Sequence, residues 1–207
     1  MGADKKPLTK EESAKVIEAA IRKAAKKPTG ELTEADLEKV TYLSLADKKL
    51  TEVPNGLAKL SQLTDLRLSR NKLTDVKVLE RLTHLTKLRL EDNQLTDVKG
   101  LEKLTQLTRL YLRYNQLTDV KGLEKLTRLT ELGLADNKLT DVKGLEKLNQ
   151  LTGLWLRDNQ LTDVKGLEKL TKLTFLWLTD NPDLTKVQIE QLQKALPKCR
   201  IYSNPKK

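Results

Sequence analysis

The chain has 207 residues, of which 38% are hydrophobic but only 3% aromatic, and its formal net charge is +10. One cysteine, Cys199, and one histidine, His84, exclude an intramolecular disulfide framework and leave too few ligands for a structural zinc site or a Cys–His nucleophile. The sequence shows neither a secretory signal pattern nor an apolar run long enough to span a membrane.

The N-terminal region carries the signals of two helices. Residues 1–8 are expected to be disordered. Thr9 opens an S/T-x-x-E capping box, and apolar residues at helical spacing continue the predicted helix to near Lys27. Thr33 predicts the N-cap of a second, shorter helix. We expect residues 9–39 to form a helical cap, because the first coil of the repeats described below would otherwise expose its leucines to water.

An amphipathic helix at residues 11–27 that serves a partner or a membrane is the alternative. Its apolar face is mostly alanine and has no large aromatic residue, which disfavours membrane binding. The sequence leaves open whether this helix packs on the repeats or projects from them.

Residues 40–181 contain seven copies of one pattern, spaced by about 22 residues. A fixed period of this length is typical of a solenoid, in which each copy forms one coil and stacks on the next. The copies open at Val40, Leu63, Leu85, Leu107, Leu129, Leu151 and Leu173. A single coil has too few apolar residues to bury them without its neighbours, so the seven copies are predicted to share one continuous core.

The copy at residues 107–128 shows how one coil is built. Leu110 and Leu112 alternate with polar or aromatic residues, which predicts a short strand with one leucine face. Beyond Asn115 the apolar residues recur at gaps of three, which favours a 3₁₀-like or irregular return over an α-helix. Stacked coils would place their strands in a parallel sheet, and the glycines that recur in the return would serve its bend.

Asparagine recurs at the ninth place of six copies, at positions 71, 93, 115, 137, 159 and 181. The chain must turn out of the strand there, which leaves backbone groups without a sheet partner. A short amide carries donors and an acceptor and can satisfy such groups from inside the turn. We therefore interpret the column as structural rather than as a ligand-binding site.

The motif LxxLxLxxNxL, read from Leu107 to Leu117, resembles the leucine-rich repeat. The 22-residue length and the LTDVKGLEKL return resemble the bacterial internalin-like and SDS22-like classes. The resemblance covers residues 40–181 and implies an α/β solenoid: a right-handed superhelix with a concave parallel β-sheet, a 3₁₀ or irregular convex side and helical caps at both ends. It also implies that the concave side recognises other molecules. The first copy departs from the motif, with Lys48 in place of asparagine.

A different pattern begins after Asn181. Thr185 opens a second capping-box pattern, which predicts a helix of about three turns that ends before Pro197. Cys199 and Ile201 alternate as a final short strand. We expect residues 182–207 to form a C-terminal cap and tail.

The net charge invites a nucleic-acid interpretation, which the distribution of charge disfavours. The predicted concave positions are the third, fifth, seventh and eighth of each copy, and they carry seven basic and eight acidic residues. A surface for phosphates should have one sign. The positive excess lies instead on the convex returns and in the tail.

The residues that vary between copies are the candidates for function. Six of the seven aromatic residues fall at concave positions, and Gly133 leaves a bare step between two of them, Tyr111 and Trp155. Exposed Trp, Tyr and Arg are typical of interface hot spots. The predicted partner-binding residues are Tyr111, Tyr114, Trp155, Phe175, Trp177, Arg89, Arg109, Arg113, Arg157 and Glu131.

We therefore expect a non-enzymatic scaffold that binds a protein or peptide, as a monomer, with no cofactor, nucleic acid or membrane partner. A carbohydrate or cell-wall glycan binder is one alternative, because sugar rings stack on aromatic side chains. A structural or designed repeat scaffold without a ligand is another, because aromatic ladders also stabilise sheets. Asp136, Asp158 and Asp180 are a weaker alternative as Ca²⁺ ligands. The bacterial resemblance is compatible with export or a cell-surface location.

Overall fold

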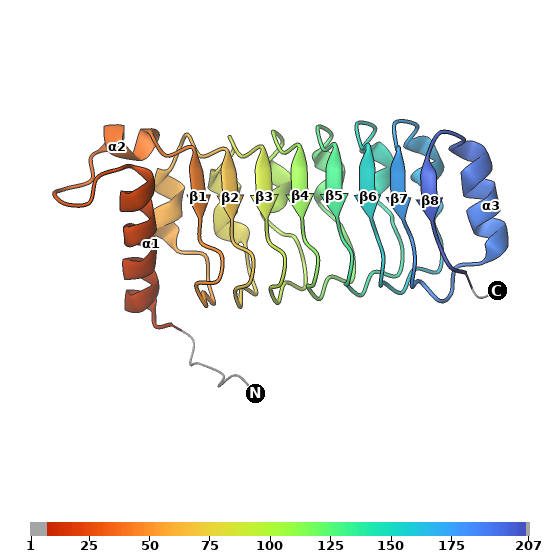
Figure 1. Ribbon diagram of the computed structural model, residues 1–207, viewed down its shortest axis with the longest axis horizontal. Coiled ribbons are helices and arrows are strands. Elements are labelled where there is room, and N and C mark those ends of the chain that lie inside the picture. The colour runs from red at the N-terminus through yellow and green to blue at the C-terminus, as the bar shows by residue number, and fades with distance from the viewer. Residues whose placement is uncertain (1–7, 206–207) are drawn as a thin grey trace.

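The computed structural model describes residues 8–205, so the expectation of disorder lies outside the described residues except for Leu8, which packs partly buried against the core. The eight strands form one sheet, and Figure 1 shows them side by side in chain order, with α-helices at both ends of the row. The helices are α1 (Lys10–Ala24), α2 (Glu34–Glu38) and α3 (Lys186–Ala195). The strands are β1 (Tyr42–Ser44), β2 (Asp65–Arg67), β3 (Lys87–Arg89), β4 (Arg109–Tyr111), β5 (Glu131–Gly133), β6 (Gly153–Trp155), β7 (Phe175–Trp177) and β8 (Arg200–Tyr202).

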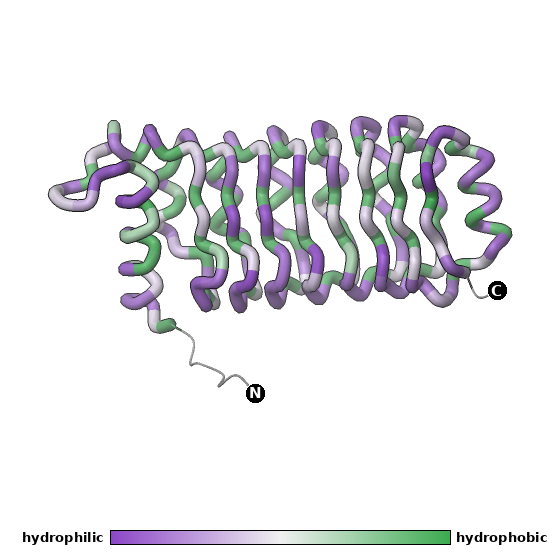
Figure 2. Tube along the Cα trace, in the orientation of Figure 1, coloured by the Kyte–Doolittle hydropathy of each residue, from purple (hydrophilic) through white to green (hydrophobic). Residues whose placement is uncertain are grey.

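All eight strands are parallel and pair in sequence order from β1 to β8. The central leucine of each strand lies opposite the central leucine of the next, for example Leu110 opposite Leu132. These leucines are buried, and Figure 2 shows hydrophobic residues recurring at the same level of successive coils. The predicted parallel sheet with a shared leucine core is confirmed, as is the fold class.

Short 3₁₀ helices form the returns on the convex side, as the three-residue spacing predicts. They are η1 (Asn55–Lys59), η2 (Lys77–Arg81), η3 (Leu101–Lys103), η4 (Leu123–Lys125), η5 (Leu145–Lys147) and η6 (Leu167–Lys169). Gly100 shows why glycine precedes η3: its φ is +93°, and a Cβ there would lie 2.7 Å from the Cα of Lys77. Only glycine fits that bend without strain.

The buried asparagine column bonds to backbone, as expected. The Asn115 amide nitrogen donates to the carbonyl oxygens of Leu90 and Leu112, each at 3.0 Å. Its oxygen accepts a hydrogen bond from the N–H of Leu95 at 3.0 Å. Two of these three partners belong to the preceding coil, so each amide joins two coils.

The N-terminal helix packs on the solenoid, which answers the question left open by the sequence. Ile17 and Ile21 of α1 are buried in the common core at the β1 end (Figure 1). The Thr9 capping box is present, but α1 ends at Ala24 rather than near Lys27. It ends early because Lys26 adopts a left-handed conformation, with φ +56°, and closes the last turn.

The C-terminal segment adds α3 and an eighth strand. Thr185 caps α3 as predicted, and Leu192 buries its inner face, whereas Val187 is exposed to solvent. Strand β8 continues the sheet in register, with Ile201 opposite Leu176. We propose the division into a cap at 9–39, repeats at 40–181 and a second cap at 182–207. Among the described residues, no helix is both long and apolar enough to cross a lipid bilayer.

Candidate binding face

The concave face carries the third and fifth residues of each copy, which are the first and last residues of its strand, because the central leucine points into the core. The seventh and eighth residues follow in the turn. Every eighth residue of the seven copies has a positive φ, between 52° and 59°. Aspartate tolerates this conformation and occupies five of these places, whereas Tyr114 and Arg70 are unusual there.

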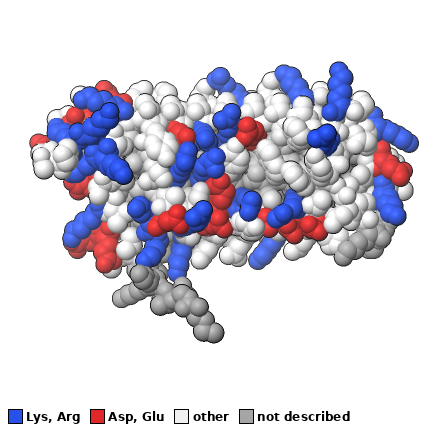
Figure 3. Space-filling model, in the orientation of Figure 1, with Lys and Arg blue, Asp and Glu red and all other residues white. Residues whose placement is uncertain are grey.

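The N-terminal part of the face is covered by ion pairs between its own residues. Lys87 lies 3.7 Å from Asp65, and Arg109 lies 3.2 Å from Glu131 on the next strand. Arg89 lies 3.3 Å from Glu91. Figure 3 shows blue and red groups more densely over the N-terminal strands than over β6 and β7. Charged partners would have to compete with these internal pairs.

Tyr111 is held in place by charged neighbours. Its hydroxyl donates a hydrogen bond to Glu131, and the guanidinium of Arg89 lies 4.8 Å from its ring centroid. Burial, together with the hydrogen bond to Glu131, raises the pKa of Tyr111 to about 12. The phenol is therefore a neutral donor with a fixed ring position.

The C-terminal part of the face is aromatic. The rings of Trp177 and Tyr202 stack with centroids 4.6 Å apart and an interplanar angle of 21°. Phe175 is 46% exposed and Trp177 is 38% exposed, although both are large apolar residues. Exposed apolar clusters of this kind are characteristic of interaction surfaces. Tyr202 was missed by the sequence interpretation, which counted concave positions only as far as the seventh copy.

Trp155 lies differently from its neighbours. Its ring lies along its own strand, over Gly153, where a Cβ would be 2.7 Å from the indole Cη2. Gly133, on the preceding strand β5, has no side chain. Tyr111 leans toward it, with its Cδ1 atom 3.2 Å from the position that a Cβ at Gly133 would take. The two glycines thus leave the middle of the aromatic row open.

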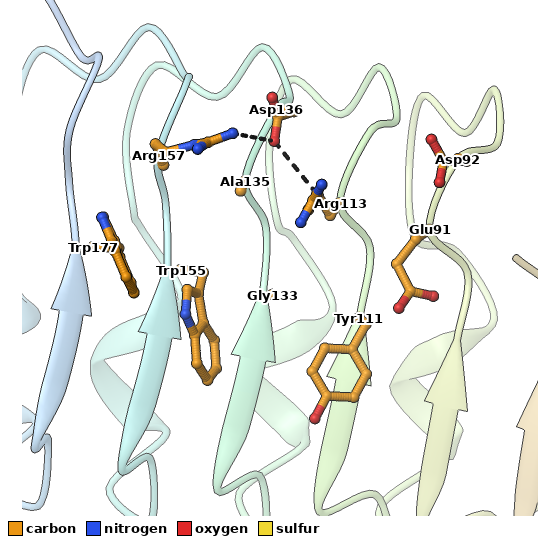
Figure 4. A pocket seen from close by; sticks show the side chains of 10 residues that line it. All are labelled: Glu91, Asp92, Tyr111, Arg113, Gly133, Ala135, Asp136, Trp155, Arg157 and Trp177. Atoms are coloured by element: carbon orange, nitrogen blue, oxygen red, sulfur yellow. Dashed lines mark ion pairs between the residues drawn. The ribbon is translucent and has the colours of Figure 1, made fainter.

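A hollow of about 490 Å³ occupies this opening (Figure 4). Gly133 and Ala135 lie at its base, between Tyr111 on one side and the two indoles on the other. Charged residues stand on the turn side of the same opening. The lining residues are Glu91, Asp92, Tyr111, Arg113, Gly133, Ala135, Asp136, Trp155, Arg157 and Trp177.

Asp136 lies between two arginines at the edge of the hollow. Its Oδ2 atom is 3.7 Å from Arg113 Nε and 3.6 Å from Arg157 Nη2, and it accepts no hydrogen bond. Burial raises the pKa of the Asp136 carboxyl against the opposing effect of Arg157. The arginines are also engaged elsewhere, Arg113 over the ring of Tyr114 and Arg157 with Asp158 at 2.8 Å.

Among the described residues, no three His, Cys, Asp or Glu side chains converge on a metal position, so the structure adds no support to the calcium alternative. Asp136 and Asp158 turn toward arginine instead. Asp180 exchanges hydrogen bonds with Asn204, whose amide nitrogen donates to its Oδ1 at 3.0 Å. Internal partners therefore occupy all three carboxylates.

The hollow brings together five of the ten predicted partner-binding residues: Tyr111, Trp155, Trp177, Arg113 and Arg157. The other five do not line it. Phe175 lies beside it on β7, Tyr114 lies under Arg113, and Arg89, Arg109 and Glu131 surround Tyr111. Asp136 and Gly153 gain a role in shaping the site that the sequence did not assign to them.

Comparisons with known proteins agree with this architecture. A family model described as leucine rich repeats (2 copies) matches residues 83–125, 105–147 and 149–194, and a second leucine rich repeat model matches residues 38–95. No curated protein sequence matches the chain.

Two internalin structures from Listeria monocytogenes are similar to the chain. Internalin inlF has a TM-score of 0.83 and 28% identity, over 91% of this chain and 55% of its own. Internalin C2 (inlC2) has a TM-score of 0.72 and 29% identity, over 91% of this chain and 92% of its own. The chain thus spans just over half the length of inlF. Repeat sequence, sheet architecture and these likenesses lead to one conclusion: the chain belongs to the leucine-rich-repeat family and is internalin-like.

Proposed function

We propose that the chain is a non-enzymatic scaffold that recognises a protein or peptide through its concave face. Leucine-rich-repeat proteins are generally protein-interaction scaffolds. The internalin likeness also supports an exported or cell-surface location, which we include in the proposal.

The observation that carries the proposal is the contrast between the two parts of the face. From β2 to β5 the charged side chains pair with one another, so that little attraction remains for a partner. Around β6 and β7, Phe175 and Trp177 are exposed beside the hollow. Large exposed aromatic residues beside a concave opening are typical of the few residues that dominate an interface. Binding energy is therefore expected to concentrate between Tyr111 and Trp177.

A capture experiment with two forms of the chain tests this proposal. The wild type and a Tyr111→Ala, Trp155→Ala, Trp177→Ala variant are used to capture partners from lysate and envelope fractions of the source organism. Circular dichroism checks that the variant keeps its fold. A protein retained by the wild type and lost by the variant supports the proposal. Equal retention by both forms would contradict it.

The same capture separates a protein partner from a glycan. Protease treatment of the fractions should abolish capture, whereas an excess of soluble oligosaccharide should leave it unchanged. The opposite pattern would favour the carbohydrate alternative, because sugar rings also stack on exposed indoles.

A further inference from the structure

The last residues of the strands form a row across the sheet, and at its C-terminal end this row contains an interrupted aromatic stack. Tyr202 and Trp177 occupy neighbouring strands and stack face to face at 4.6 Å. Trp155 is the next residue of the row, but its ring lies down over Gly153 and does not extend the stack. Gly133, one strand further, has no ring to offer. The row therefore leaves the space beside the free face of Trp177 open, and the hollow occupies that space (Figure 4).

We propose that this opening receives one aromatic side chain of the protein partner, which inserts beside Trp177 and continues the Tyr202–Trp177 stack. The proposal rests on the proposed function and names the anchor that the face accepts. Adjacent strands are about 4.8 Å apart, which is also a normal centroid spacing for stacked rings. Two consecutive places, above Trp155 and Gly133, lack an upright ring. The opening thus has room for a ring that lies parallel to Trp177.

The charges around the opening favour a neutral ring over a charged group. Glu91 is paired with Arg89, and Asp136 lies between Arg113 and Arg157. A carboxylate would face these acids, and an ammonium or guanidinium would face the two arginines. A neutral aromatic ring meets neither repulsion, and its faces attract the guanidinium groups at the edge. An aliphatic side chain would fill the space but would not gain the stacking interaction.

The two tryptophans of the chain provide a direct measurement, because both line the opening. Their indole N–H signals are followed in ¹H–¹⁵N spectra while N-acetyl-tyrosine amide is added to the full chain. N-acetyl-leucine amide and N-acetyl-arginine amide are added in parallel. We expect the tyrosine amide to shift both indole signals and to bind about two- to tenfold more tightly than the leucine amide.

Two variants locate the binding. Gly133→Val places a side chain in the opening and should weaken tyrosine amide binding at least about tenfold, as expected for filling a pocket. Gly56→Ala is the matched control, because a Cβ at Gly56 meets nothing within 4 Å. Trp177→Leu removes the stacking face but keeps the opening, so the preference for tyrosine amide over leucine amide should disappear.

Equal binding of the leucine amide, tighter binding of the arginine amide, or no shift of the indole signals would overturn the inference. A soluble glucose trisaccharide that shifted both signals more strongly than the tyrosine amide would also overturn it. These results are independent of the capture experiment. A protein captured through the concave face without aromatic preference in the opening would leave the scaffold function standing and remove only the anchor.

Discussion

The Tyr111 hydroxyl on β4 donates a hydrogen bond to the Glu131 carboxylate on the neighbouring strand β5, and Glu131 also lies 3.2 Å from Arg109. Tyr111→Phe keeps the ring but removes the donor, so the free energy of unfolding should fall by about 0.5–1.5 kcal/mol. Urea unfolding measures the change. Tyr42→Phe is the control, because Tyr42 lies on the same face and is exposed. Equal effects of the two substitutions would contradict a role for the hydrogen bond.

Tyr111 also predicts that the folded chain loses stability at alkaline pH. Its pKa is raised to about 12 in the folded chain, so folding favours the neutral phenol. This contribution is complete below the unfolded pKa of about 10 and is lost as the pH rises through the folded value. Absorbance titration should show a tyrosine transition near 12 that is missing in Tyr111→Phe. An unchanged titration of the variant would show that another tyrosine is responsible.

Asp36, in the N-terminal cap, predicts that the folded chain loses stability in acid. The Lys27 ammonium and the Thr33 hydroxyl hold the pKa of the Asp36 carboxyl well below its usual range. The contribution is complete above the unfolded pKa of about 3.9 and is lost as the pH falls through the folded value. Asp36→Asn should therefore lower the thermal midpoint at neutral pH, with a difference that shrinks in acid. A constant difference from neutral to acidic pH would refute the assignment.

Asp136, at the edge of the hollow, predicts the opposite effect: its ionisation lowers the stability of the folded chain. Burial raises the pKa of its carboxyl, so the folded chain disfavours the charged form. The cost is absent in acid and appears as the pH rises through the unfolded value toward the folded one. Asp136→Asn, which suits the φ of +56°, should raise the thermal midpoint at neutral pH and lose this gain in acid. A lower midpoint at neutral pH would show that the arginine contacts outweigh burial.

The asparagine column should be sensitive to substitution. Asn115→Ala leaves two buried carbonyl oxygens and one N–H without their partner. Each unsatisfied group costs about 1–3 kcal/mol, so the free energy of unfolding should fall by about 3 kcal/mol or more. Asn149→Ala, at an exposed turn, is the matched control in denaturant unfolding. Similar losses at both sites would argue against the backbone bridge.

Alanine substitutions at two glycines of the convex returns allow the cost of backbone strain to be measured separately from the cost of a steric clash. Gly122→Ala, at φ +100°, places its Cβ 3.7 Å from the nearest side-chain atom, so only strain of about 1–2 kcal/mol is expected. Gly100→Ala places its Cβ 2.7 Å from the Lys77 backbone and should cost about 1–3 kcal/mol more. Urea unfolding of both variants gives the comparison. Equal costs would show that the Lys77 segment yields freely.

The repeat made most of the fold predictable. Leucines at fixed places determine which strand face is buried, and a constant copy length sets the register, so neighbours such as Trp155 and Trp177 followed from counting. The early end of α1 did not follow, because the left-handed Lys26 has no glycine or asparagine signal. Tyr202 did not follow from the same counting, because β8 is paired with β7 at a spacing of 25 residues, with α3 between them, instead of the 22 residues that separate neighbouring strands from β2 to β7.

The shape of the candidate site was less predictable than its residues. The sequence placed Gly133 between two aromatic residues and indicated an opening there, and the hollow includes it. The direction of the Trp155 ring depends on the missing side chain at Gly153, two residues earlier on the same strand. Ring direction is a side-chain torsion set by local packing, and periodicity carries no information about it. The ion pairs that occupy the predicted arginines arise in the same way.

The asparagine bridges also determine how the solenoid can come apart. Asn71 donates to the Leu45 carbonyl of the first coil and accepts hydrogen bonds from the N–H groups of Lys48 and Leu50. If that coil peeled away, the amide would keep its place in the second coil but lose those partners. The same bonds recur at each junction, so every coil depends on its neighbours for part of its stability. Unfolding is therefore expected to be cooperative over several coils, with a sharp melting transition.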